Sequence, residues 1–191
     1  MAYIGLRKPI IGKMKENGTY EKPFKCGQAI GITVTPNYAE SSLDADDVQI
    51  EYDKVFNYAD TSLNTSTLPR EAHTIMFGHK SGDSETEIVC DADDEPSFVG
   101  FGFVAVEKIN GKKKYTGNFL CKVKFSEPSG EYATRGDNIE YKTPSISGRA
   151  LANDKGKWKF FDWFDTEAEA LEYVYKKFGF KPDGTEITEE T

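Results

Sequence analysis

The chain has 191 residues, enough for one domain, and its 13% aromatic content with only 38% apolar residues favours a β-rich fold with much polar surface. A formal net charge of −8 argues against a protein that grips DNA, because such proteins normally carry a basic face that displaces counterions from phosphates. No apolar run approaches the roughly 18 residues of a membrane span, and no signal peptide is visible, so we expect a cytoplasmic product.

The N-terminal third combines irregular, alternating and acidic stretches. Residues 1–22 show no clean hydrophobic period, and we predict an arm with one short strand. Residues 28–35 alternate apolar and small or polar side chains, which predicts a strand with one buried face. The acidic, polar stretch 36–47 predicts a loop, and alternation resumes in a strand from Val48.

A short helix is predicted between Ser66 and Gly78. Ser66 or Thr67 can cap its start, Pro69 suits its first turn, and glycine suits the position just past its end. Four apolar residues fall near one face and are expected in the core: Leu68, Ala72, Ile75 and Met76.

The middle of the chain carries a strong hairpin signal. After a short strand at residues 88–90, Asn110-Gly111 lies between the alternating runs 98–109 and 113–125, a pattern typical of a β-hairpin. Gly100 and Gly102 in the first run suggest close packing or a bulge. Further extended segments are predicted over residues 138–148 and 157–164.

The last predicted element is a helix over residues 166–178. Thr166 and Glu169 have the spacing of a capping box, and Gly179 ends the helix. Its apolar residues repeat at helical spacing: Leu171, Val174, Tyr175 and Phe178.

Together these elements predict an α+β, mainly β fold with a sandwich or barrel-like core. One helix, near residues 68–77, packs on the core, and an additional C-terminal helix covers 166–178. We expect an N-terminal arm (1–22), a β domain (23–178) and a polar C-terminal tail (179–191).

No motif for catalysis, a metal or a cofactor is apparent, and we expect a protein that is not an enzyme. His73 and His79 lack a second ligand pair nearby in sequence, so a structural or surface role is favoured over metal binding. The acidic run 91–95 resembles the start of a calcium loop, but Pro96 stands where that loop needs glycine, and a charged turn is favoured. The odd, widely spaced cysteines are expected to be small, reduced core residues: Cys26, Cys90 and Cys121.

Four segments resemble the major tail protein family of long, non-contractile tails of phages and prophages of Gram-positive bacteria. They are LDADD at 43–47, the predicted helix from TLPRE to FGH at 67–79, a third segment over 93–115, and a long run at 122–144. The last is similar to the family's pattern KFxxPxxxYxTKGDxIExxTP. The segments occur in the family's order and span residues 43–148.

The resemblance implies a tail-tube β-sandwich or barrel whose subunits stack as hexameric rings around a lumen that conducts DNA during ejection. It implies the tape measure protein and the tail terminator and tip proteins as partners, and the virion tail, assembled in the host cytoplasm, as the location. DNA would pass without sequence-specific binding, and no cofactor is implied.

Two groups of residues are expected to serve assembly. A polar, acidic group is predicted to face the lumen or a ring contact: Tyr38, Glu40, Asp44, Asp46, Asp47, Gln49, Glu51 and Asp53. The N-terminal arm is predicted to bridge rings through Tyr3, Ile4, Leu6 and Arg7.

Two other classes of function stay open at this point. A monomeric β-sandwich binding module of carbohydrate or adhesion type would expose an aromatic platform, with Trp158, Phe161 and Trp163 as candidates. A small hydrolase ranks below both, because no nucleophile–base pair is visible.

Overall fold

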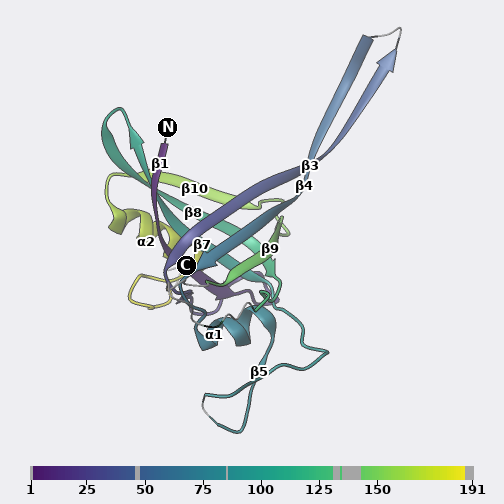
Figure 1. The fold of residues 1–191 in the computed structure, drawn as a ribbon. Coiled ribbons are helices and arrows are strands. Elements are labelled where there is room, and N and C mark those ends of the chain that lie inside the picture. Colours follow the sequence, from purple (N-terminus) through teal and green to yellow (C-terminus); the bar gives the residue numbers. More distant parts are fainter. Residues whose placement is uncertain (1, 46–47, 85, 131–133, 135–142, 188–191) are drawn as a thin grey trace.

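The computed structural model describes residues 2–45, 48–84, 86–130, 134 and 143–187, and over this part strands dominate (Figure 1). The strands are β1 (Ala2–Lys13), β2 (Phe24–Lys25), β3 (Ala29–Ala45), β4 (Val48–Thr65), β5 (Lys80–Ser81), β6 (Ile88–Val89), β7 (Val99–Ile109), β8 (Lys112–Phe125), β9 (Ser145–Leu151) and β10 (Lys159–Phe164). The helical segments are α1 (Arg70–Ala72), the π-helical turn η1 (His73–Phe77) and α2 (Glu167–Phe178). The predicted α+β, mainly β class is confirmed.

One large antiparallel sheet organises the chain. Its strands follow the order β2-β1-β7-β8-β9-β4-β3. On the same edge of β8, β10 pairs with residues 115–120 and β9 with residues 122–125. The sheet curls so that the inner faces of β7 and β8 look toward β4 and β9. The main core fills this space, with α1 and η1 at one end, through Phe77, Phe101, Leu120, Phe125 and Ile146.

Helix α2 covers the outer face of β7, β8 and β10 and forms a second core. Val174 and Phe178 lie over glycines of β7. A methyl group added at Gly102 would lie 2.3 Å from a Val174 side-chain carbon, so larger residues there would push the helix away. The close packing that Gly100 and Gly102 suggested is therefore confirmed, as is a bulge, between Val99 and Phe101.

Local signals placed two elements correctly. The Thr166 side chain accepts a hydrogen bond from the Glu169 backbone amide, and the Glu169 carboxylate accepts one from the Thr166 amide, which completes the predicted capping box of α2. Asn110 and Gly111 both have positive φ, as a tight hairpin turn between β7 and β8 requires.

The predicted helix near 68–77 is present, but its predicted cap is wrong. Pro69 occupies the N-cap and gives no side-chain hydrogen bond. The Ser66 hydroxyl instead accepts a hydrogen bond from the Gln28 amide, which ties the segment to the start of β3. Ala72 and Met76 are buried as expected.

The predicted loop at 36–47 is also wrong where the structure describes it. Strand β3 continues to Ala45, and β4 begins at Val48, so the acidic residues extend a hairpin. Polar residues are compatible with this, because a ribbon that projects into solvent has no buried face to keep apolar. Of the predicted extended segment 138–148, residues 138–142 lie outside the described part, and the remainder contributes to β9.

The N-terminal segment is not a separate arm. Strand β1 runs through residues 2–13 between β2 and β7, and Ile10 and Ile11 are fully buried. Two register shifts interrupt its pairing with β7, which explains why no clean period was visible in the sequence. None of the described helices is both long enough and apolar enough to span a bilayer.

Candidate functional site

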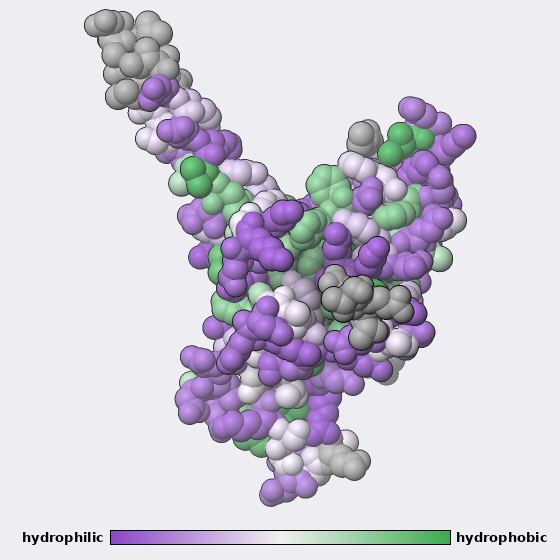
Figure 2. Space-filling view, turned by 180° about the vertical axis from the view of Figure 1, so that it is seen from behind, coloured by the Kyte–Doolittle hydropathy of each residue, from purple (hydrophilic) through white to green (hydrophobic). Residues whose placement is uncertain are grey.

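The end of the β3–β4 hairpin is a two-stranded ribbon that stands clear of the body (Figures 1 and 2). Strand β4 pairs with β9 only over residues 59–64, whereas β3 and β4 pair with each other along their whole length. In the described structure, residues 36–45 and 48–58 therefore have no strand on their outer edges. We call these two stretches the ribbon. Unpaired edges of this length present free backbone groups for another strand.

The ribbon exposes large side chains together with acidic ones. Tyr38, Tyr52 and Val55 are 41%, 53% and 65% exposed. Residues 36–58 carry six acidic residues and one lysine, a net −5 of the chain's −8. Such a surface offers apolar area for contact with another protein, and its negative electrostatic potential repels phosphates.

An aromatic cluster holds the ribbon to the body at its base. Phe56 stacks on Trp158 with ring centroids 4.7 Å apart, and Tyr38 packs edge-on against Phe56 at 6.0 Å. Lys54 lies 4.6 Å over the Tyr38 ring and pairs with Glu40 at 2.6 Å. The hydrogen bond from Lys54 lowers the pKa of the Glu40 carboxyl, so this exposed pair stays charged at neutral pH.

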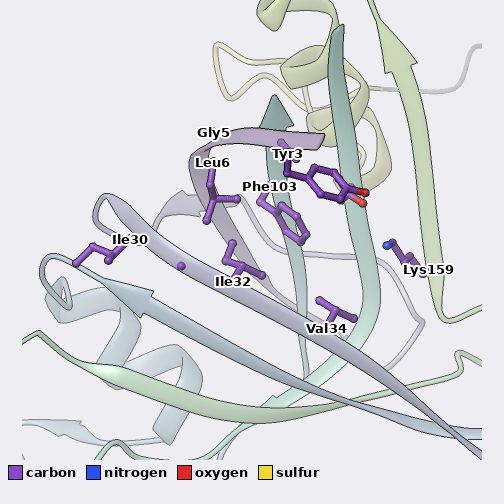
Figure 3. A pocket seen from close by; sticks show the side chains of 11 residues that line it. Tyr3, Gly5, Leu6, Ile30, Ile32, Val34, Phe103 and Lys159 are labelled. Carbon is purple, nitrogen blue, oxygen red and sulfur yellow. The ribbon is translucent and has the colours of Figure 1, made fainter. Parts of the chain in front are cut away.

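Beside the ribbon, an open groove of about 480 Å³ lies along the seam where β1 approaches β3 (Figure 3). Its lining is mainly apolar: Tyr3, Gly5 and Leu6 from β1, Ile30, Gly31, Ile32 and Val34 from β3, and Phe103 and Ala105 from β7. Asn118 and Lys159 supply the polar part, and burial lowers the pKa of the Lys159 ammonium. The groove exists because the curled sheet does not close between β1 and β3.

The predicted buried face of the 28–35 strand is the wall of this groove. Ile32 and Val34 are half-buried, but Ile30 is 56% exposed at the rim, so the prediction holds only in part. Tyr3, which lines the groove, is 73% exposed, and its neighbour Ile4, which is not part of the lining, is 52% exposed.

The residues predicted to form a ring-to-ring arm lie in different places, some at the groove and one against helix α2. Tyr3 and Leu6 line the groove, whereas the Arg7 guanidinium donates to the Glu167 carboxylate of α2 at 2.6 Å. Lys8 reaches the same carboxylate at 2.9 Å, and the Lys8 and Arg7 partners lower the pKa of Glu167. These two ion pairs therefore link the middle of β1, at Arg7 and Lys8, to the first turn of α2.

The predicted lumen or ring-contact residues fall on the ribbon. Tyr38, Glu40, Glu51 and Asp53 are exposed there. Asp44 and Gln49 are strand residues that pair with each other near the tip. Asp46 and Asp47 lie outside the described residues.

Strand β10 carries a second exposed aromatic pair. Phe161 and Trp163 are 50% and 47% exposed and pack edge-on at 5.2 Å. Trp158 does not join them, because it is half-buried against Phe56. The candidate platform for a binding module is thus reduced from three residues to two.

No protein-family model matches this chain, and a search of curated proteins gives no significant match.

Proposed function

We propose that this chain is the structural subunit of a phage tail tube, which assembles into stacked hexameric rings around a lumen that conducts DNA. The ribbon is the observation that carries the proposal. A two-stranded hairpin is marginally stable alone in water, and among the described residues no strand pairs with either edge of this one. Contact with another subunit would supply the missing strand partners and cover the exposed aromatic side chains.

The groove supports the same proposal. An apolar seam with an exposed rim is the kind of surface that protein contacts cover, and it lies beside the base of the ribbon. A ring of identical subunits needs two complementary surfaces on each subunit, because a head-to-tail interface joins two different patches. The ribbon and the groove would provide such a pair.

The charge of the ribbon fits passage of DNA. A lumen wall that carried many lysines or arginines would bind phosphates and slow the genome. Six acidic residues against one lysine over 36–58 would repel it instead. The tape measure protein and the terminator and tip proteins are the remaining partners that the resemblance of residues 43–148 implies.

Negative-stain electron microscopy of the concentrated protein, paired with light-scattering mass, tests the proposal. Rings or tubes of uniform width are expected. A species that stays near 21.4 kDa, even after tail-tip components are added as an initiator, would contradict it.

A triple variant tests the role of the ribbon charge. Replacement of Asp44, Asp46 and Asp47 by asparagine is expected to alter assembly or DNA ejection, because it removes three of the acidic charges of residues 36–58. Virions that assemble and eject normally with this variant would count against a lumen or ring-contact role.

The exposed pair Phe161 and Trp163 favours a second candidate, a monomeric binding module of carbohydrate or adhesion type. Aromatic rings of this kind provide stacking surfaces for ligands. Glycan-array binding by the monomer, lost in Trp163→Ala, would support this candidate over the tube.

A further inference from the structure

Strand β5 lies at the end of the body away from the ribbon (Figure 1). Three potential metal ligands from separate segments meet next to it. The potential ligand atoms of His79, Cys90 and Glu127 all lie within 4.8 Å of one another. His79 is 4% exposed, whereas Cys90 and Glu127 lie at the surface. The sequence analysis did not find this group, because 10 residues lie between the histidine and the cysteine and 36 between the cysteine and the glutamate.

The local fold explains why His79 and Cys90 face each other. Strands β5 and β6 pair Lys80 with Val89 and Ser81 with Ile88. The next position of the same antiparallel register joins residue 79 to residue 90. Gly78, with a φ of +80°, turns the chain out of η1 directly before the histidine. Glu127 arrives from β8, two residues after the buried Phe125.

The contacts of the His79 ring suit a ligand histidine. Its Nε2 lies 3.7 Å from a Glu127 carboxylate oxygen, and its Nδ1 lies 3.4 Å from Nδ1 of His73. Histidines that bind metals through one ring nitrogen generally donate the other N–H to a fixed acceptor. His73, on η1, is placed to accept that bond and to hold the ring in position.

We propose that His79 Nε2, the Cys90 thiolate and the Glu127 carboxylate form a binding site for a divalent cation of the zinc class, with His73 as a positioning residue. Nitrogen, sulfur and oxygen donors together match the borderline softness of Zn²⁺. The thiolate and the carboxylate together balance the charge of a divalent ion. Three protein ligands leave a fourth position for water or another donor.

The distances need only a small adjustment. In a tetrahedral zinc site, bond lengths of about 2.0–2.3 Å place neighbouring donors roughly 3.4 Å apart. The histidine–carboxylate distance of 3.7 Å is close to that value. Cys90 and Glu127 are exposed, so rotation of their side chains can close the remaining gap. A bound ion would link η1, the β5–β6 hairpin and the end of β8.

Cobalt titration of the full chain, after treatment with a chelator, tests the site. One Co²⁺ per chain is expected, with a thiolate-to-cobalt charge-transfer absorption, and Zn²⁺ is expected to displace it. Absence of that absorption in the wild-type chain at stoichiometric Co²⁺ would overturn the proposal, whatever the variants do.

Variants assign the ligands. Cys90→Ser is expected to abolish the charge-transfer absorption, and Glu127→Gln to weaken Zn²⁺ binding about tenfold or more, as measured by competition with a chromophoric chelator. Both residues are exposed, so both variants are expected to fold, which circular dichroism checks. Asp93→Asn, an exposed acid in the following turn, is the matched control and is expected to bind as the wild type.

An exposed cysteine alone could bind a soft metal, and the Zn²⁺ affinity of Glu127→Gln distinguishes that case from the three-ligand site. Unchanged Zn²⁺ affinity in Glu127→Gln would overturn the three-ligand site. His73→Ala is expected to lower affinity about tenfold while the charge-transfer absorption remains, because it acts through the orientation of His79. The proposal stands or falls independently of tail-tube assembly.

Discussion

The β7–β8 and β3–β4 hairpins are both long and antiparallel, but they differ in how much of each is covered by the rest of the chain. In the β7–β8 hairpin, nine of the eleven β7 residues are buried, with the main core on one face and α2 on the other. The distal part of β3–β4 has neither a covering element nor a strand on its outer edges in the described structure. The first hairpin is stabilised within the chain, and the second presents surface that a partner would have to cover.

This contrast implies that stability and assembly are separable. Changes around β7–β8 should lower the free energy of unfolding, whereas changes on the ribbon should leave it nearly unchanged and act on association. Four variants or conditions sharpen the contrast, in decreasing order of their expected effect on stability.

Phe178→Ala should have the largest effect. The ring lies fully within the second core, 4.8 Å from Phe119 and 5.4 Å from Tyr20 between centroids. Truncation of a buried phenylalanine lowers the free energy of unfolding by about 3–5 kcal/mol, measurable by urea denaturation. Phe161→Ala, at an exposed ring, is the control and should cost under about 1 kcal/mol. Similar losses in the two variants would contradict the description of the core.

A rise from pH 9 to pH 10 should destabilise the covered body next. Burial raises the pKa of Cys26 to about 12 and that of Cys121 to about 11, from an ordinary 9.0. The folded chain then keeps protons that the unfolded chain releases, so this contribution is intact below pH 9 and is lost as pH rises toward 11–12. The free energy of unfolding should fall by up to about 1.4 kcal/mol per pH unit for each thiol. Burial also raises the pKa of Tyr20, which acts in the same direction.

Denaturation curves between pH 8 and pH 11 measure this slope. Cys26→Ala should make the slope shallower, whatever it does to the stability at neutral pH. A slope that is unchanged in this variant would show that the Cys26 thiol is not protected in the folded chain.

Thr166→Ala should have an intermediate effect. It removes the side-chain acceptor of the Glu169 amide at the start of α2. Loss of such a cap costs about 1 kcal/mol, readable as a lower urea midpoint with an unchanged denaturant slope. Thr166→Ser keeps the acceptor and should retain most of the stability. Equal losses in both variants would mean that the hydrogen bond is not what stabilises the helix start.

Shortening the ribbon should affect stability least and assembly most. Replacement of residues 42–52 by Asn-Gly keeps the Ser41–Asp53 pair and gives the hairpin a tight turn. The thermal midpoint should stay close to that of the wild type, because β4 pairs with β9 only over residues 59–64, outside the removed stretch, while rings or tubes should no longer form by electron microscopy. Normal tubes from this variant would refute the proposed role of the ribbon.

Sequence alone was a good guide where the signal is local. The Thr166–Glu169 capping box, the Asn110-Gly111 turn and the helix after Pro69 depend on hydrogen bonds and dihedral preferences within a few residues. The mainly β class followed from alternation and aromatic content in the same way. Neighbouring side chains fix these features, so a single sequence suffices to predict them.

Tertiary structure decided where strands extend and what they face. An acidic stretch that reads as a loop is part of a long hairpin, because register with β4 continues beyond the body. Residues 2–13, predicted as part of an arm with one short strand, form a strand that pairs with β7 despite two register shifts, and residues 9–12 of it are buried. The groove and the His79–Cys90–Glu127 cluster are each built from segments that are separate in sequence. The hydrophobic periodicity of one segment does not predict which other segment it contacts. The groove follows from the curl of the large sheet, and the meeting of His79 with Cys90 follows from the pairing of β5 with β6.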